Sequence, residues 1–399
     1  MNSIAETFQA HVEANPDAAC IVPHDRPQLS RQDVLDHAHG IANRLYAAGA
    51  RTGSRVTVIV EKSPEAFMLY LACNLAGYVY HPANSAYTDA ELDYLIQDAA
   101  PAVVICAPVR AETLDALGDH TTLTLDQDCT GSLLDQTDER HRPYTAQPED
   151  WAALLYTSGT TGKPKGAMLS QENLLSNART LVDAWRFTEA DRLLHMLPIF
   201  HAHGLFVAGN TCLCAGASLL FEPAFSTDRF FERVADATCF MAVPTLYGRL
   251  LKDARLTPEA VGHMRLFTSG SAPLDAVAYD AFEATAGSRI LERYGMTETL
   301  MLTSNPYDEE RRAGTVGPPL PGVSLRIRKE DGQIAETGES GIVEVSGPNV
   351  CAGYSNLPEK TKEAFTGDGY LITGDIGVMS EDGYVTLQGR MSDMIISGG

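Results

Sequence analysis

Short apolar segments alternate with amphipathic segments along much of the chain, and this alternation restricts the fold more than any other feature of the sequence. Apolar runs at 56–60 and 102–106 are separated by segments of helical periodicity near 64–77 and 89–99. Ser30 precedes a further helical pattern and has the character of an N-terminal cap. Strands that alternate with helices form parallel sheets, which bind ligands at the carboxyl ends of their strands. The sequence therefore predicts an α/β fold.

The same alternation is repeated further along the chain, and the pattern then changes. The chain of 399 residues exceeds the limit of about 250–300 residues for one hydrophobic core, so more than one subdomain is expected. A second series of short apolar strands and helical stretches runs from about 191 to 300. From about 313 to 389, short strands punctuated by Gly and Pro predict a small β-barrel or a curved sheet. We therefore expect two stacked α/β subdomains, with parallel-rich sheets flanked by helices, to about residue 305, followed by a β-rich subdomain.

The chain carries an excess of acidic side chains, with 52 Asp and Glu against 30 Lys and Arg and a formal net charge of −22. This charge repels nucleic-acid phosphates and anionic lipid headgroups, so neither a nucleic acid nor a membrane is expected as a partner. An anionic substrate must therefore meet local positive charge. The first residues show neither a basic region nor an apolar signal segment, and the cytoplasm is the default location.

A loop rich in Gly, Thr and Lys, Tyr156-Thr-Ser-Gly-Thr-Thr-Gly-Lys-Pro-Lys-Gly166, follows an apolar strand and precedes a helix near 171–184. Glycines let backbone N–H groups approach an oxyanion, hydroxyls donate hydrogen bonds, and the two lysines supply positive charge. A Walker A loop would need glycine at Thr157 and a hydroxyl at Pro164. The loop is therefore predicted to bind phosphate in a different way, with a plain surface turn as the alternative.

Five further motifs follow this loop along the chain. They are Leu197-Pro-Ile-Phe-His-Ala-His-Gly204, Ser269-Gly-Ser-Ala-Pro273, Arg293-Tyr-Gly-Met-Thr-Glu298, Thr373-Gly-Asp375 and Gly389-Arg-Met-Ser-Asp393. With these motifs in this order, the chain resembles the adenylate-forming superfamily, which includes the acyl-CoA synthetases. The resemblance implies that an acid attacks the α-phosphate of ATP to give an acyl-adenylate and pyrophosphate, and that CoA then displaces AMP. ATP and Mg²⁺ are the implied cofactors, and CoA is the implied co-substrate.

The resemblance also implies the residues of a nucleotide site. Thr297 would bind the α-phosphate, Glu298 would hold Mg²⁺ through its carboxylate, and Asp375 would accept hydrogen bonds from the ribose hydroxyls. Taken singly, Glu298 could be a surface acid and Asp375 a turn residue. The complete set implied for the nucleotide is Thr157, Ser158, Gly159, Thr160, Thr161, Gly162, Lys165, Gly270, Ala272, Tyr294, Gly295, Thr297, Asp375 and Arg390.

Within the superfamily the resemblance is closest to malonyl-CoA synthetases, through several segments between 243 and 323. It assigns the distal carboxylate of malonate to Arg249, with Ser271 and Arg293 as further donors. A bidentate guanidinium suits a planar carboxylate, which would be costly to bury without a partner. Arg249 could instead be a helix-surface residue. Arg293 could bridge a neighbouring glutamate.

His201 stands where amino-acid-activating relatives have an aspartate, so an amino acid substrate is disfavoured. The resemblance makes His201 a gate between the acid pocket and a thiol tunnel, and the implied catalytic residues are His201, Thr297 and Glu298. A lone histidine could also be purely structural. Methylmalonate or another short carboxylic acid remains an alternative substrate, and a non-catalytic module that binds nucleotide and acid remains an alternative function.

The last motif ends at Asp393, which the resemblance identifies as the hinge before a small C-terminal domain. In the family that domain carries the adenylating lysine. We therefore expect residues 1–389 to form the large N-terminal domain and 390–399 to comprise the hinge and a truncated end. Without the C-terminal lid domain, the chain is expected to bind its substrates but to turn them over poorly.

Overall fold

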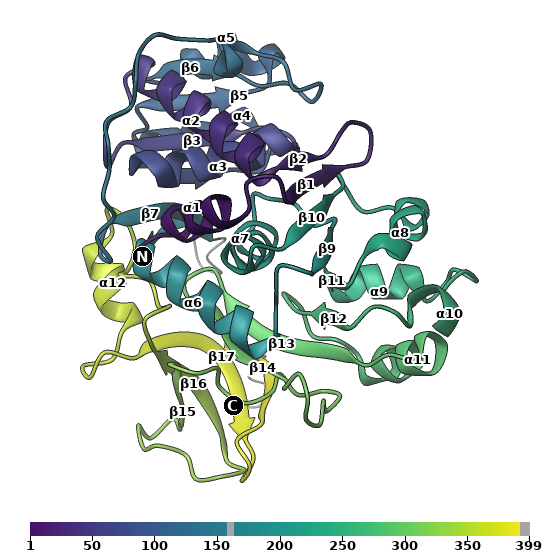
Figure 1. The fold of residues 1–399 in the computed structure, drawn as a ribbon. Coiled ribbons are helices and arrows are strands. Elements are labelled where there is room, and N and C mark those ends of the chain that lie inside the picture. Colours follow the sequence, from purple (N-terminus) through teal and green to yellow (C-terminus); the bar gives the residue numbers. More distant parts are fainter. Residues whose placement is uncertain (158–162, 392–399) are drawn as a thin grey trace.

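Three β-sheets form the framework of residues 1–157 and 163–391, the part of the chain that the computed structural model describes (Figure 1). The strands of the first sheet are β3 (Arg55–Ile59), β4 (Val79–Pro82), β5 (Val103–Cys106), β6 (Thr121–Thr124), β7 (Trp151–Thr157) and β8 (Lys165–Ser170). Their order is β6-β5-β3-β4-β7-β8, and β8 is antiparallel to β7 whereas the other pairs are parallel.

The second sheet is also largely parallel. Its strands are β1 (Ala19–Pro23), β2 (Leu29–Ser30), β9 (Arg192–His195), β10 (Ser218–Phe221), β11 (Cys239–Ala242), β12 (Leu266–Ser269), β13 (Ile290–Met296) and β14 (Leu300–Ser304). The order is β14-β13-β12-β11-β9-β10-β1-β2, with antiparallel pairing at both ends. The predicted pair of α/β subdomains is therefore present, with parallel-rich sheets in both.

The third sheet consists of β15 (Ser324–Arg328), β16 (Ser340–Ser346), β17 (Leu371–Met379) and β18 (Val385–Arg390), which are antiparallel in chain order. The prediction of a small β-barrel was wrong, because within the described residues β15 and β18 are not paired and the sheet stays open. A curved β-rich subdomain was the correct part of that expectation. Figure 1 shows this sheet below the two α/β layers.

Helices cover the two parallel-rich sheets, and the last helix of the described residues packs against β17 of the third sheet. They are α1 (Ile4–Ala14), α2 (Arg31–Ala47), α3 (Pro64–Ala76), α4 (Asp89–Ala99), α5 (Ala111–Asp115), α6 (Gln171–Ala184), α7 (Asn210–Ala215), α8 (Thr227–Arg233), α9 (Pro244–Leu250), α10 (Pro258–Val261), α11 (Ala276–Ala286) and α12 (Pro358–Ala364). Short 3₁₀ segments span Pro108–Arg110, Ser132–Leu134 and Val234–Asp236, and a π-helix, η3, spans His203–Gly209. Within the described residues, no helix is both long and apolar enough to cross a membrane.

Helix α2 begins where its capping residue predicts. The Ser30 side chain accepts a hydrogen bond from the Asp33 backbone N–H, and the Asp33 carboxylate accepts one from the Ser30 N–H. This reciprocal pair satisfies two amide groups that a helix start leaves without partners.

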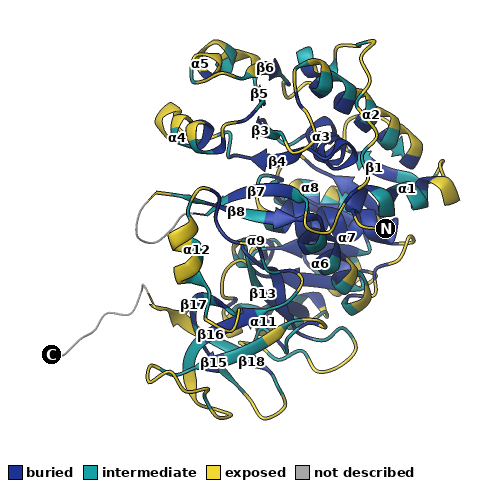
Figure 2. Ribbon diagram, turned by 90° about the vertical axis from the view of Figure 1, so that its left-hand side faces the viewer, coloured by how far each residue is buried: buried dark blue, intermediate teal, exposed yellow. Residues whose placement is uncertain are grey.

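Helix α3 joins the two α/β subdomains into one core. Every residue of α3 is buried, as expected for a helix that is apolar on all sides. Tyr70 packs against Phe206 of η3 with ring centroids 5.4 Å apart, and Phe67 meets Phe221 of β10 at 5.9 Å. Figure 2 shows the buried centre around α7 and the exposed outer faces of α4 and α12. The two parallel-rich layers are therefore parts of one shared core.

The loop predicted to bind phosphate lies in a β-hairpin, which the sequence did not predict. Strand β8 pairs with β7 from Trp151↔Ser170 to Thr157↔Lys165, and α6 begins only after β8. The N-terminus of α6 is capped by the Ser170 side chain, which accepts from Asn173 N–H at 3.1 Å. The predicted helix near 171–184 is therefore confirmed as α6, and β8 is the additional element between it and the loop.

A buried aspartate ties together the amino-terminal ends of the second sheet. Asp191 accepts hydrogen bonds from Arg265 Nε at 2.6 Å and Arg265 Nη2 at 2.8 Å, and from Thr238 Oγ1 at 2.8 Å. These residues directly precede β9, β12 and β11. The Asp191 side chain is only 5% exposed, so the pair is largely removed from water.

Replacing Asp191 by alanine leaves the Arg265 guanidinium without its carboxylate. We expect Asp191→Ala to lower the free energy of unfolding by about 3 kcal/mol or more, measured by urea denaturation. Asp183→Ala removes an exposed aspartate and is the matched control, with an expected change within about 0.5 kcal/mol. Equal losses in the two variants would contradict this role for Asp191.

Candidate active site

Most of the predicted site residues that the structure describes lie on or just after strands of the three sheets. Thr157 ends β7 and Lys165 begins β8, and the loop of Gly270, Ser271 and Ala272 follows β12. Strand β13 carries Arg293, Tyr294 and Gly295, the turn after it carries Thr297 and Glu298, and β17 and β18 carry Asp375 and Arg390. The predicted residues Ser158, Gly159, Thr160, Thr161, Gly162 and Asp393 lie outside the described residues.

Helix α4 holds both flanks of the hairpin loop. The Tyr156 hydroxyl donates to Asp98 Oδ2 at 2.5 Å, and the Tyr94 hydroxyl donates to the Pro164 carbonyl at 2.9 Å. The Lys163 ammonium lies 5.0 Å from the centroid of the Tyr94 ring. The two ends of the loop are therefore fixed against one helix of the first α/β subdomain.

A first cluster connects the hairpin to the predicted metal carboxylate. The Tyr354 hydroxyl donates to Glu298 Oε1 at 2.9 Å, and the Lys165 ammonium lies 4.2 Å from the centroid of the Tyr354 ring. Glu298 is 5% exposed and is therefore not the surface acid that was its alternative. Tyr354 was missed in the sequence analysis, because its partner lies 56 residues away along the chain.

Glu298 fits a role in Mg²⁺ binding, although not as a complete site. Its carboxylate is a hard oxygen donor, which Mg²⁺ prefers. Among residues 1–157 and 163–391, no group of three or more His, Cys, Asp and Glu side chains could hold a metal ion by itself. A single carboxylate that shares the ion with phosphate oxygens is the usual arrangement for Mg²⁺ bound with a nucleotide. The assignment of Mg²⁺ to Glu298 therefore remains a prediction.

A second cluster surrounds Asp375. The Tyr294 hydroxyl donates to Asp375 Oδ2 at 2.5 Å, and Arg390 Nε donates to Asp375 Oδ1 at 3.0 Å. The Asp375 N–H donates to Thr373 Oγ1, so the backbone is fixed as well. Each carboxylate oxygen has a further lone pair, and Asp375 can therefore still accept hydrogen bonds from hydroxyl groups of a ligand.

A third cluster is centred on Arg293, which is buried without any hydrogen-bond partner. Its side chain lies within the protein at 2% exposure, and Nε, Nη1 and Nη2 all lack partners among the described residues. Arg293 does not pair with Glu292 or Glu298, which were its alternative partners. Gly270 makes room for it, because a Cβ atom there would lie 2.2 Å from Arg293 Nη1. Burial lowers the pKa of Arg293 to about 9, so it remains charged at neutral pH.

Ser271 and His203 complete this cluster. His203 Nδ1 lies 3.3 Å from Ser271 Oγ, and His203 Nε2 has no partner among the described residues. Burial first, and the charge of Arg293 second, lower the pKa of His203 well below its ordinary value, so the imidazole is neutral. The sequence analysis gave His203 no role. Its position two residues after His201 in the same motif was the one available signal.

The structure does not bring Arg249 and His201 into these hydrogen-bonded clusters. Arg249 is exposed on α9, with its guanidinium 5.0 Å from the centroid of the Phe225 ring. His201 is exposed in the segment after β9, and its ring packs against Phe200 at 4.3 Å. Their assigned roles therefore remain predictions.

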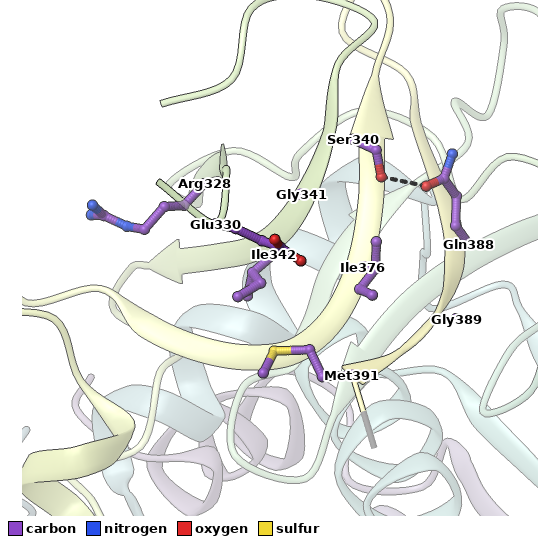
Figure 3. A pocket seen from close by; sticks show the side chains of 9 residues that line it. All are labelled: Arg328, Glu330, Ser340, Gly341, Ile342, Ile376, Gln388, Gly389 and Met391. Atoms are coloured by element: carbon purple, nitrogen blue, oxygen red, sulfur yellow. Dashed lines mark hydrogen bonds between the residues drawn. The ribbon is translucent and has the colours of Figure 1, made fainter. Parts of the chain in front are cut away.

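A hollow also lies on the third sheet, lined by Ile376, Gly389 and Met391, the chain neighbours of Asp375 and Arg390 (Figure 3). Ile342 and Ile376 line its floor, Met391 closes one side, and the Ser340 hydroxyl donates to Gln388 Oε1 at 2.5 Å. None of the predicted site residues that the structure describes lines this hollow. It is therefore not the candidate site.

The parallel-rich sheets carry charged side chains near the ends of their strands, which is where α/β proteins usually bind ligands. The fold and the clusters are therefore those of a ligand-binding α/β protein. Residues 8–355 match the family model for AMP-binding enzymes, and the chain belongs to this family. The family inferred from the motifs is thereby confirmed.

Individual members of the family are similar to most of this chain. A malonate–CoA ligase of Arabidopsis thaliana is 34% identical over 382 residues, which cover 88% of this chain and 62% of that protein. A sulfoacetate–CoA ligase of Cupriavidus necator is 35% identical over 396 residues, covering 96% and 77%. The crystal structure of ATP-bound MatB from Rhodopseudomonas palustris matches with a TM-score of 0.96 and 48% identity, over 99% of this chain and 80% of that one.

The chain thus spans less than two thirds of the length of the Arabidopsis relative. Malonate–CoA ligases are among its relatives, as the motifs predicted. The comparisons do not confirm that a C-terminal domain is missing.

Glu292, directly before Arg293, is a buried carboxyl group whose proton is held unusually tightly. It is 6% exposed, and burial raises its pKa from 4.5 to about 7 despite the Gly314 N–H that donates to Oε1 at 3.2 Å.

This shift predicts how stability depends on pH. Between pH 4.5 and about 7 the folded chain binds more protons at Glu292 than the unfolded chain, so stability falls as pH rises through this window and is level above it. Titration of Glu292 across this window changes the free energy of unfolding by about 3 kcal/mol in total. Glu292→Gln keeps an acceptor for Gly314 but cannot titrate, so its urea midpoints at pH 5, 6, 7 and 8 should lack this contribution. If the urea midpoint of the variant fell between pH 5 and 7 as steeply as that of the wild-type chain, the raised pKa of Glu292 would be contradicted.

Proposed function

We propose that the chain provides the ATP-binding and acid-binding site of an acid:CoA ligase that activates malonate. In the proposed reaction one carboxylate of malonate attacks the α-phosphate of ATP, which gives malonyl-adenylate and releases pyrophosphate. The thiol of CoA then displaces AMP and forms malonyl-CoA. Methylmalonate differs by one methyl group, worth about 1–3 kcal/mol in a pocket, and is the alternative substrate.

The observation that carries the proposal is the buried guanidinium of Arg293, which has no hydrogen-bond partner among residues 1–157 and 163–391. A buried charge without a partner is costly, and an anionic ligand would remove that cost. When one carboxylate of a dicarboxylic acid reacts, the other stays ionised and needs such a cation. Malonate and sulfoacetate, the acids named for two relatives, both carry a second acidic group. We therefore assign the distal carboxylate to Arg293 and Ser271, with Arg249 as a further donor.

The nucleotide would lie between the other two clusters. Asp375 would accept hydrogen bonds from the ribose hydroxyls with Arg390 beside it, and the Tyr294 ring would enclose adenine together with the Gly270–Ala272 loop. Thr297 would bind the α-phosphate, and the hairpin from Thr157 to Lys165 would hold the triphosphate. Mg²⁺ held by Glu298 would neutralise phosphate charge.

Binding is the measurement that tests this proposal on the present chain, because the chain spans only part of its relatives. We would titrate malonate and acetate by calorimetry into the chain saturated with Mg²⁺ and a non-hydrolysable ATP analogue. Malonate should bind more tightly. Arg293→Met should weaken malonate binding by about 30-fold or more, since truncating one partner of a buried charge pair costs about 2–5 kcal/mol.

Two further variants control this experiment. Arg289→Met makes the same chemical change at an exposed arginine and should leave malonate binding unchanged. Arg249→Ala should weaken malonate binding less than Arg293→Met, because exposed charge pairs contribute little. Acetate binding as tight as malonate binding, together with full malonate affinity in Arg293→Met, would exclude the dicarboxylate assignment.

A further inference from the structure

His203 is held rigidly, although the sequence motif gave it no function. It begins η3 and is 7% exposed. The next residue, Gly204, is fixed from two sides: His195 Nε2 lies 2.7 Å from its carbonyl oxygen, and a Cβ atom on it would lie 2.0 Å from the Pro198 carbonyl oxygen. The ring of His195 is in turn stacked on Phe221 at 5.3 Å. The backbone at His203 therefore has little freedom.

Ser271, the partner of His203, has a strained backbone. Its φ of 68° lies in the left-handed region, which a serine rarely occupies. Strained residues persist where surrounding contacts hold them, and they concentrate at binding sites. The 3.3 Å contact from His203 Nδ1 is the side-chain contact that fixes the Ser271 hydroxyl.

The ring nitrogen of His203 that carries the proton determines whether the Ser271 hydroxyl can donate a hydrogen bond to a ligand. If the serine hydroxyl donated to His203, its hydrogen would no longer be available to a ligand. If Nδ1–H donates to Ser271 Oγ instead, the serine hydrogen stays free to bond an anion. Burial, and after it the nearby charge of Arg293, lowers the pKa of His203 and keeps the imidazole neutral, which permits a single proton on Nδ1.

We propose that His203 is a positioning residue that donates from Nδ1–H to Ser271 Oγ, so that the Ser271 hydroxyl points its hydrogen at the anion bound by Arg293. His203 thereby favours acids with a second anionic group over monocarboxylic acids. The inference rests on the proposed function, because the ligand is the distal carboxylate assigned there to Arg293.

Asparagine and leucine are nearly equal in shape, and they form a matched pair of substitutions for His203. Asparagine can place an amide N–H near the position of Nδ1, whereas leucine cannot donate. In the titration with Mg²⁺ and the ATP analogue, His203→Leu should weaken malonate binding about tenfold. His203→Asn should restore most of that affinity. Binding of the ATP analogue, which reports an intact fold, should stay unchanged in both variants.

A double-mutant cycle separates this role from simple packing. Ser271→Ala, at an exposed position, should weaken malonate binding by a similar factor, and it should add no further loss in the His203→Leu background. Additive losses, equal losses in the asparagine and leucine variants, or full malonate affinity in His203→Leu would each overturn the role of His203. If Ser271→Ala alone leaves malonate affinity unchanged, the role is overturned even where the His203 variants fail to fold.

The wild-type chain distinguishes failure of this inference from failure of the proposed function. If wild-type chain prefers malonate to acetate but the His203 and Ser271 variants retain that preference, only the inference is wrong. If the wild-type chain shows no preference for malonate, the proposed function and the inference that rests on it are both wrong.

Discussion

Strand β13 determines how the rest of the candidate site is arranged. Successive side chains of a strand point to opposite faces, and Arg293 and Tyr294 accordingly belong to different clusters. Arg293 lies among Gly270, Ser271 and His203, whereas the Tyr294 hydroxyl reaches Asp375 in the third sheet. Gly295 fixes the pairing with β14, because a Cβ atom there would lie 1.8 Å from the Leu300 carbonyl oxygen. The Arg293 and Asp375 clusters are thus connected through adjacent residues of one strand.

Burial also distinguishes Arg293, on this strand, from Arg249. The sequence alone made both arginines candidate partners of the distal carboxylate. Resemblance to malonyl-CoA synthetases favoured Arg249 as the main anchor of the distal carboxylate, but this side chain is exposed on α9. Arg293 is removed from water and has no hydrogen-bond partner in the part of the chain that the structure describes, so an anion would gain far more by pairing with it. Burial decides the relative weight of the two residues, and burial cannot be read from a motif.

The sequence predicted those helices and strands whose signals lie within a short stretch of the chain. Ser30 predicted the start of α2, and the alternation of strands and helices predicted both parallel-rich layers. Strand β8 was missed because Lys165–Ser170 lies between a polar loop and a helix and has no clear alternation. Barrel closure was wrong because it depends on pairing between distant strands. His203 and Tyr354 escaped prediction for the same reason, since their partners lie 68 and 56 residues away.

Tyr354 also belongs to a short segment that pairs with β8, the edge strand of the first sheet. Residues 352–355 run along β8 as an additional antiparallel partner: Met168 N–H donates to the Gly353 carbonyl at 3.0 Å, Ala352 N–H donates to the Met168 carbonyl at 3.2 Å, and Ser355 N–H donates to the Gly166 carbonyl at 2.8 Å. Unpaired strand edges invite chains to associate with one another. Detaching the third sheet from the first would therefore leave the outer edge of β8 unpaired and open to pairing with a strand of another chain.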